Sequence, residues 1–183
     1  MRIAVIGWGS LIWDPRKLRI RDGWKDDGPW LPIEFARISQ RDRLTLVMHP
    51  GVKLQQTYWA ISEFADLNSV RENLKTREGT VLQYIHSVTR NDISEDKIRD
   101  AIIKWLIAHK MDAAVWTGLP SNFREKRGVE FSVDEAVRYL RELVDSRRHK
   151  NAEGYIRRTP RRIRTEVRKR AEKEFGWLPS DNT

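Results

Sequence analysis

Strand-like patterns occupy the first half of this 183-residue chain and helix-like patterns the second half. Runs that are β-branched, or in which apolar and polar residues alternate, favour strands. They lie at residues 2–6, 33–38, 43–48, 55–61, 81–88 and 112–116. The order lacks the alternation of strand and helix that is typical of a doubly wound sheet. The sequence therefore predicts the α+β class, with a small mixed or closed sheet flanked by helices, and a loop over residues 14–32 after the first strand.

Four polar residues are expected to begin helices. Asp66 precedes the apolar positions of a short helix, and Ser94, followed by acidic residues, precedes the clearest apolar stripe. Ser132 and Glu135 form a capping box, and Thr159-Pro160 fits the start of a last helix. The length suits one domain, residues 1–183. Within it we expect a strand-rich half, a completing segment and a basic C-terminal helix, at 1–90, 91–146 and 147–183.

Composition excludes several classes of site. The chain has no cysteine, so it has no disulfide, thiolate metal ligand or cysteine nucleophile. The four histidines are isolated in sequence, and no metal site is predicted from them. No run approaches the length of a membrane-spanning helix, and residues 1–6 do not resemble a secretion signal. We expect a soluble, cytoplasmic protein.

Basic charge is concentrated near the C-terminus. The formal net charge is +9, and residues 147–173 contain twelve Lys or Arg against three Glu. Such a segment could contact nucleic acid or another acidic partner. Aromatic residues of the kind that stack on bases are nearly missing there, so a solvated helix face is the favoured interpretation.

The turn after the first strand is the first candidate site. It reads Gly7-Trp8-Gly9-Ser10-Leu11. Two glycines let the backbone turn its N–H groups toward an anion or a carbonyl oxygen. Ile12 stands where a dinucleotide fingerprint needs glycine, and no Gly-Lys-Ser/Thr follows, so neither a Rossmann loop nor a P-loop is predicted. A plain turn at the end of a strand is the alternative.

Glu78 is the first candidate for acid–base chemistry. It lies between a predicted helix and strand, directly before Gly79. A carboxylate at such a place can point into the end of a sheet, where burial raises its pKa. Taken alone it can equally be a solvated loop residue. Glu34, inside a strand-like run, and Glu63, just past another, are the alternatives.

Together, residues 7–13 and Glu78-Gly79 resemble the signature of the γ-glutamyl cyclotransferase-like superfamily. The loop is most similar to the Tyr-Gly-Ser-Leu-Ile-Trp form of its ChaC-like branch. The similarity continues in order and spacing over roughly the first ninety residues. It includes the segments Glu34–Ser39, Arg43–Val47, Tyr58–Ile61, Leu74, Arg77–Gly79 and Tyr84.

The resemblance implies a small mixed β-barrel flanked by helices, and an intramolecular aminolysis. In that reaction the α-amino group of a γ-glutamyl compound attacks its own γ-carbonyl and releases 5-oxoproline with an amine or amino acid. Glu78 matches the family's acid–base residue. The residues implied to bind the substrate are Gly7, Trp8, Gly9, Ser10, Leu11 and Tyr84. Neither a metal nor an organic cofactor is implied.

One departure from the family pattern concerns substrate placement. The family's loop begins with Tyr, whereas Trp8 keeps an aromatic wall and an N–H donor but has no phenolic oxygen. Glutathione, γ-glutamyl amino acids and γ-glutamylamines all remain possible substrates, since they differ only beyond the scissile amide. The alternative function is a binding module that keeps the fold without the activity, with its basic segment contacting an acidic partner.

Overall fold

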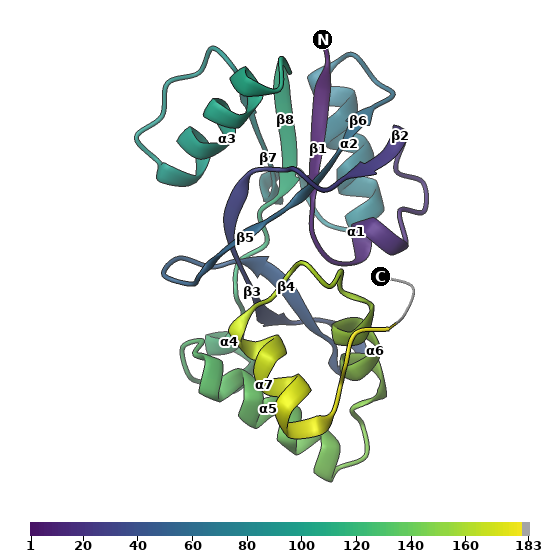
Figure 1. Cartoon of the computed structure of the whole chain (residues 1–183), viewed down its shortest axis with the longest axis vertical. Helices are drawn as coiled ribbons and strands as arrows, with labels where there is room; N and C mark the ends of the chain where they lie inside the picture. Colours follow the sequence, from purple (N-terminus) through teal and green to yellow (C-terminus); the bar gives the residue numbers. More distant parts are fainter. Residues whose placement is uncertain (181–183) are drawn as a thin grey trace. The chain divides into compact units, whose positions relative to one another are not determined.

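The computed structural model describes residues 1–180 and divides the chain into two compact units (Figure 1). Unit 1 comprises Met1–Leu31 and Gln56–Gly118. Unit 2 comprises Pro32–Gln55 and the chain from Leu119 onward. No helix within residues 1–180 has the length and apolar character needed to cross a membrane.

Helices and strands are mixed in both units, which confirms the α+β class. The strands are β1 (Ile3–Gly7), β2 (Ile20–Lys25), β3 (Trp30–Ile38), β4 (Leu44–Met48), β5 (Leu54–Gln56), β6 (Tyr58–Ser62), β7 (Ile85–Thr89) and β8 (Ala113–Thr117). The α-helices are α1 (Ser10–Trp13), α2 (Leu67–Glu78), α3 (Lys97–Ala108), α4 (Phe123–Arg127), α5 (Val133–Asp145), α6 (Lys150–Arg158) and α7 (Glu166–Phe175). Two short 3₁₀ turns are η1 (Gln40–Asp42) and η2 (Leu82–Tyr84).

Unit 1 is built on a mixed five-stranded sheet of order β2-β6-β1-β8-β7. The central strand β1 pairs antiparallel with β6 and parallel with β8, where Val5 lies opposite Val115. Every residue of β1 is buried. This agrees with its continuous β-branched sequence, because a strand covered on both faces is apolar throughout.

Helix α2 carries the candidate base at its C-terminal end. Asp66 caps its N-terminus by accepting a hydrogen bond from Ser69 N at 2.8 Å, as its position in the sequence predicts. Val70 and Leu74 are buried in the core of unit 1. The helix ends at Gly79, whose left-handed φ of 62° suits a glycine C-cap. Glu78 is therefore the last helical residue.

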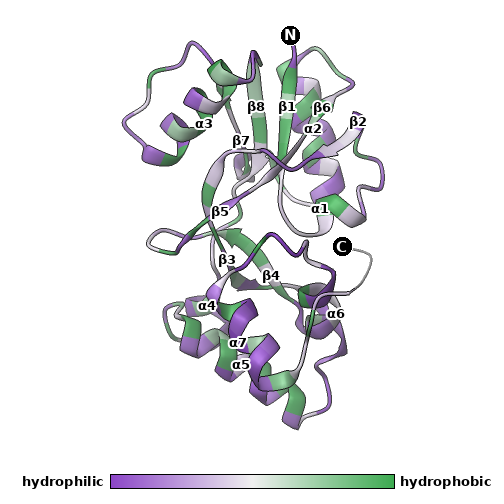
Figure 2. Ribbon diagram, viewed as in Figure 1, coloured by the Kyte–Doolittle hydropathy of each residue, from purple (hydrophilic) through white to green (hydrophobic). Residues whose placement is uncertain are grey.

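Unit 2 combines a three-stranded sheet of order β4-β3-β5 with helices α4 to α7. Ser132 caps α5 by accepting from Glu135 N at 3.1 Å, which confirms the predicted helix start. Figure 2 shows apolar and polar residues alternating along α5. Its apolar positions, which include Leu140 and Leu143, are buried.

The basic segment forms two helices, where one was expected to start at Thr159-Pro160. Thr159 closes α6 instead, with its hydroxyl donating to Tyr155 O at 3.0 Å. The next helix begins only at Glu166, capped by Thr165. Pro160 and the residues after it form a turn, because their carbonyl oxygens bind a buried arginine of α7. Residues 181–183 of the expected helix lie outside the described part of the chain.

Four other boundaries differ from expectation. The segment 14–32, expected as a loop, contains β2 and the start of β3. The single strand expected at 55–61 is interrupted at Thr57, whose N–H and hydroxyl both donate to Pro29 O. The strand expected at 81–88 begins as η2 before β7. Asp96, and not Ser94, caps α3, because its carboxylate accepts from Ile98 N and Arg99 N.

Candidate functional site

The glycine turn links β1 to the short helix α1. Gly9 has φ 79° and ψ −142°, a conformation open almost only to glycine. Its carbonyl oxygen accepts from Ile12 N at 3.0 Å and so begins the helix. The N–H groups of Ser10 and Leu11 lie in the first helical turn, where no helix carbonyl is available to them. Such N–H groups are the donors that an anion or an oxyanion needs.

Gly7 has a packing reason to be glycine. A Cβ atom built at this position would lie 2.8 Å from two ring carbons of Trp24. The missing side chain therefore lets the indole pack against the end of β1. The two glycines of the turn act differently, since Gly7 makes room and Gly9 supplies a backbone angle.

Arg77 joins Glu78 to the turn. Its Nη1 donates to Glu78 Oε1 at 2.8 Å, and its Nη2 donates to Ser10 Oγ at 3.2 Å and to Asp14 O at 2.6 Å. The Arg77 side chain is only 4% exposed. One buried guanidinium thus brings together the two motifs that sequence analysis singled out separately, 67 residues apart.

The environment of Glu78 makes it a stronger base than a surface glutamate. Burial raises the pKa of its carboxyl, while the positive charges of Arg77 and Arg16 act in the opposite direction. The side chain is 17% exposed, so its carboxylate remains open to exchange of protons. Such a carboxylate can accept a proton and return it.

The other residues of the predicted site are Trp8, Leu11 and Tyr84, and they differ in their contacts with Glu78, Arg77 and the glycine turn. Trp8 and Leu11 are buried, and Leu11 belongs to the core of unit 1. Tyr84 lies in η2, where its carbonyl oxygen accepts from Gly118 N at 2.7 Å. Within residues 1–180 no hydrogen bond joins the Tyr84 side chain to Glu78 or to the turn.

The two alternative bases occupy other surroundings. Glu34 is buried in unit 2, where its carboxylate accepts from the backbone N–H groups of Phe35 and Glu166. Glu63 is in unit 1, where it binds Arg19 Nε at 2.6 Å. Neither carboxylate is bonded to the glycine turn in the described part of the chain.

Arg77 is the residue of this arrangement that sequence reasoning missed. It was noted as part of the Arg-Glu-Gly run, without a role of its own. Its position directly before a candidate base is a usable signal, because a buried carboxylate needs a partner. The contact with Ser10 has no local signal, since it depends on the pairing of distant segments.

No group of three or more His, Asp or Glu within residues 1–180 is placed to hold a metal ion. Comparisons with models of protein families, with curated proteins and with solved structures gave no match.

Proposed function

We propose that the chain is a γ-glutamyl cyclotransferase-like enzyme, which releases 5-oxoproline and an amine or amino acid from a γ-glutamyl amide. The observation that carries the proposal is the link from Glu78 through Arg77 to the glycine turn. The three components of this link all belong to unit 1. They provide an acid–base group and a set of backbone donors in one place.

The backbone of the turn holds the glutamyl end of the substrate. In this proposal the N–H groups of Ser10 and Leu11 bind the oxyanion that forms at the γ-carbonyl. Gly9 sets their direction through its unusual backbone angles. Ser10 is itself anchored by Arg77, so the donors and the base keep a fixed relation.

Glu78 moves protons from the substrate's α-nitrogen to the leaving nitrogen during the reaction. Its carboxylate takes a proton from the substrate's α-ammonium, and the freed amine attacks the γ-carbonyl carbon. A C–N bond forms and closes the five-membered ring. As the tetrahedral intermediate collapses, the bond to the leaving nitrogen breaks and Glu78 gives its proton to that nitrogen. Glu78 then accepts the second proton of the ring nitrogen and passes it to the released amine. No water is consumed, and general acid–base catalysis of this kind contributes roughly 10²- to 10⁴-fold.

Arg77 sets the protonation state of the base. Burial favours the neutral carboxyl of Glu78 and raises its pKa. The guanidinium favours the ionised form and directs the carboxylate through a hydrogen bond. The net result is a pKa above the ordinary value, so the ionised form of Glu78 is a stronger base than a carboxylate in water.

The fold of unit 1 supports the family-specific part of the proposal. Its mixed sheet presents the turn at the end of the buried central strand β1, in agreement with the sequence-based prediction that the turn follows the first strand. We propose that this sheet corresponds to the barrel of the family. In the proposed site the buried Trp8 supplies an aromatic wall in place of the family's tyrosine.

The test is release of 5-oxoproline from glutathione, γ-glutamyl amino acids and γ-glutamylamines by the full chain. Glu78→Gln keeps the size of the side chain and removes the titratable proton, so product should fall at least 10²-fold. Glu72→Gln is the matched control, because Glu72 is on the same helix and pairs with Lys75 on the surface. It should keep full activity.

Two outcomes would contradict the proposal. Absence of product from every substrate class would show that the chain does not catalyse this reaction, and would favour the binding-module alternative. Full activity in Glu78→Gln would leave the reaction but remove the assigned base, and Glu63→Gln would then be the next variant to assay.

A further inference from the structure

A pocket lies along one face of α6, within unit 2. Its volume is about 360 Å³, and it is lined by Lys150, Glu153, Gly154, Arg157, Arg158 and Ser180. The helical residues are spaced three and four apart, so they form one stripe along α6. The opposite stripe of α6, which includes Ala152 and Ile156, is buried.

Gly154 leaves the floor of this pocket open. It lies inside a nine-residue helix, where glycine weakens the structure. Its backbone φ is not positive, and a Cβ atom built on it would have no other atom within 4 Å. Neither the backbone nor packing therefore requires glycine here. A larger side chain at this position would project into the pocket.

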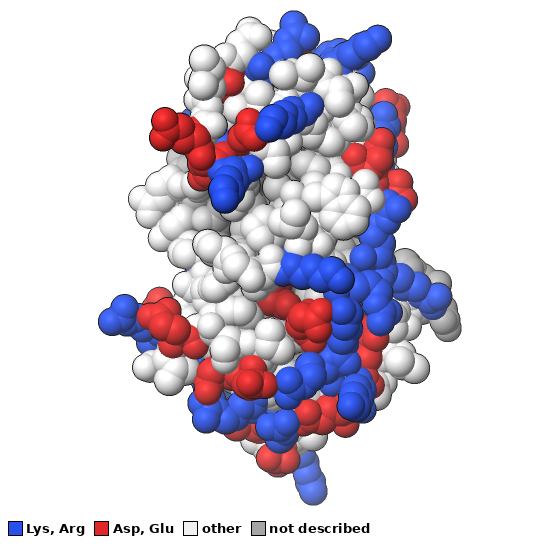
Figure 3. Space-filling model, turned by 60° about the vertical axis from the view of Figure 1, so that its left-hand side comes forward, with Lys and Arg blue, Asp and Glu red and all other residues white. Residues whose placement is uncertain are grey.

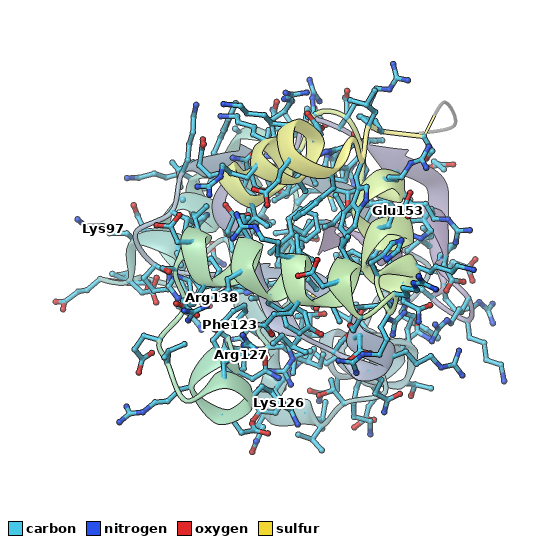
Figure 4. All side chains as sticks on the ribbon, turned by 90° about the horizontal axis from the view of Figure 1, so that it is seen from below. Lys97, Phe123, Lys126, Arg127, Arg138 and Glu153 are labelled. Carbon is cyan, nitrogen blue, oxygen red and sulfur yellow. The ribbon has the colours of Figure 1, made fainter. Side chains whose placement is uncertain are left out.

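Hydrogen bonds join Arg157 to residues 178–180, which follow α7, at one side of the pocket. Ser180 N donates to Arg157 O at 2.9 Å, and Arg157 Nε donates to Leu178 O at 3.1 Å. Arg157 Nη1 also binds Glu153 Oε1 at 3.0 Å. Glu153 is labelled on α6 in Figure 4. The charges of Arg157 and Glu153 offset each other, so among the described lining residues the remaining charge is that of Lys150 and Arg158.

Six basic residues of the 147–173 segment form ion pairs with acidic residues in the described part of the chain. Arg148, Arg164 and Lys169 are examples, paired with Asp42, Glu172 and Glu166. Figure 3 shows basic and acidic side chains next to one another on one face of the molecule. The ion pairs within residues 1–180 leave four cations of the segment without such a partner. They are Arg147, Lys150, Arg158 and Lys173.

We propose that the α6 pocket binds a ligand that carries two or more phosphate groups, held by Lys150 and Arg158. Unneutralised Lys and Arg side chains are the groups that recognise phosphate. The two residues lie about 12 Å apart along the helix axis, which favours a ligand with more than one charged group. No aromatic residue is among the described residues that line the pocket, so the proposed contacts are with phosphates and not with a base.

Isothermal titration of the full chain with pyrophosphate, ADP and a single-stranded oligothymidylate tests the proposal at low salt. The double variant Lys150→Ala/Arg158→Ala should lower the affinity for the ligand that binds at least tenfold. Arg147→Ala/Lys173→Ala is the matched control, because it removes the same charge outside the pocket. Its affinity should stay within twofold of the wild type.

A third variant distinguishes binding inside the pocket from non-specific attraction to the positive charge of the chain. Gly154→Leu keeps the net charge, suits a helix better than glycine and fills the floor of the pocket. It should unfold at a temperature no lower than the wild type and lose binding at least tenfold. Binding of pyrophosphate or ADP would identify a free phosphate ligand, and binding of the oligothymidylate alone would identify a nucleic-acid backbone. Three results would overturn the proposal: absence of binding, equal losses in the two double variants, or unchanged binding in Gly154→Leu.

Discussion

Glu34 in unit 2 and Glu78 in unit 1 are two carboxylates whose burial raises their pKa, in contrasting surroundings. Glu34 is 2% exposed and accepts hydrogen bonds from Phe35 N at 2.8 Å and Glu166 N at 2.9 Å. Val167 N, at 3.4 Å, and the Thr165 side chain add to these. This carboxylate stabilises the N-terminus of α7 and has no access to solvent.

Glu78 is held from one side only. Arg77 binds one of its oxygens, and the side chain keeps 17% of its surface exposed. The comparison teaches that a raised pKa does not by itself mark a general base. A base also needs an open path for the proton and an oxygen that the protein has not already bonded, and Glu78 combines these features.

The largest expected effect on stability concerns Glu34, the carboxylate that is fully enclosed by hydrogen bonds. Glu34→Ala leaves the N–H groups of Phe35, Glu166 and Val167 without their acceptor, which should lower the free energy of unfolding by about 3 kcal/mol. Urea denaturation measures this loss. Glu166→Ala, which removes an exposed pair with Lys169, is the control and should cost less than about 1 kcal/mol. Equal losses would show that Glu34 does not stabilise α7.

The next effect concerns Arg77, which binds the partly exposed carboxylate of Glu78. Arg77→Met removes the charge that favours ionised Glu78, so the pKa of Glu78 should rise further. Turnover should fall on the order of 10²-fold, because the base and the turn also lose their fixed relation. The acidic limb of the pH–rate profile should move to higher pH, and Arg77→Lys should restore part of this shift. An unchanged profile in Arg77→Met would contradict the electrostatic role.

A smaller effect is expected at the start of the helix that carries Glu78. Asp66→Ala removes the acceptor for Ser69 N and should lower the free energy of unfolding by about 1 kcal/mol. Asp66→Asn should be nearly neutral, since asparagine also caps helices. Thermal unfolding of the two variants compares them directly. If Asp66→Ala matches the wild type, packing alone holds α2.

The smallest effect is the pH dependence of stability. Both carboxyls have a folded pKa above their ordinary value of 4.5, so the folded chain binds more protons than the unfolded chain just above that pH. The free energy of unfolding should therefore fall as pH rises from 4.5 through the raised pKa values. Urea titrations across this window should give a weaker dependence in Glu78→Gln and Glu34→Gln. A rise in stability over the same window would contradict the raised pKa values.

Local signals in the sequence account for part of the fold. Asp66 and Ser132 predict helices because a capping side chain acts within its own turn. The prediction that a helix begins at Thr159-Pro160 was wrong, because the same residues can end one helix or begin another. Binding of Pro160 O by Arg168 at 2.6 Å, a contact formed only in the fold, decides between them.

Long-range contacts account for what the sequence could not give. Glu78 and the glycine turn were both candidates, but their link depends on Arg77 reaching Ser10 across the fold. Glu34 was an equal candidate for the base, and only its contacts with residues 132 and 133 positions away show that it is a helix cap. The parallel pairing of β1 with β8 likewise has no local signal.

The most direct test compares 5-oxoproline formation by Glu78→Gln and Glu34→Gln in one assay, with each rate divided by the concentration of folded protein. The account predicts that Glu78→Gln loses at least 10²-fold in turnover, while folded Glu34→Gln molecules turn over like the wild type. Equal rates in the two variants, or a greater loss in Glu34→Gln, would contradict the assignment of Glu78 as the base.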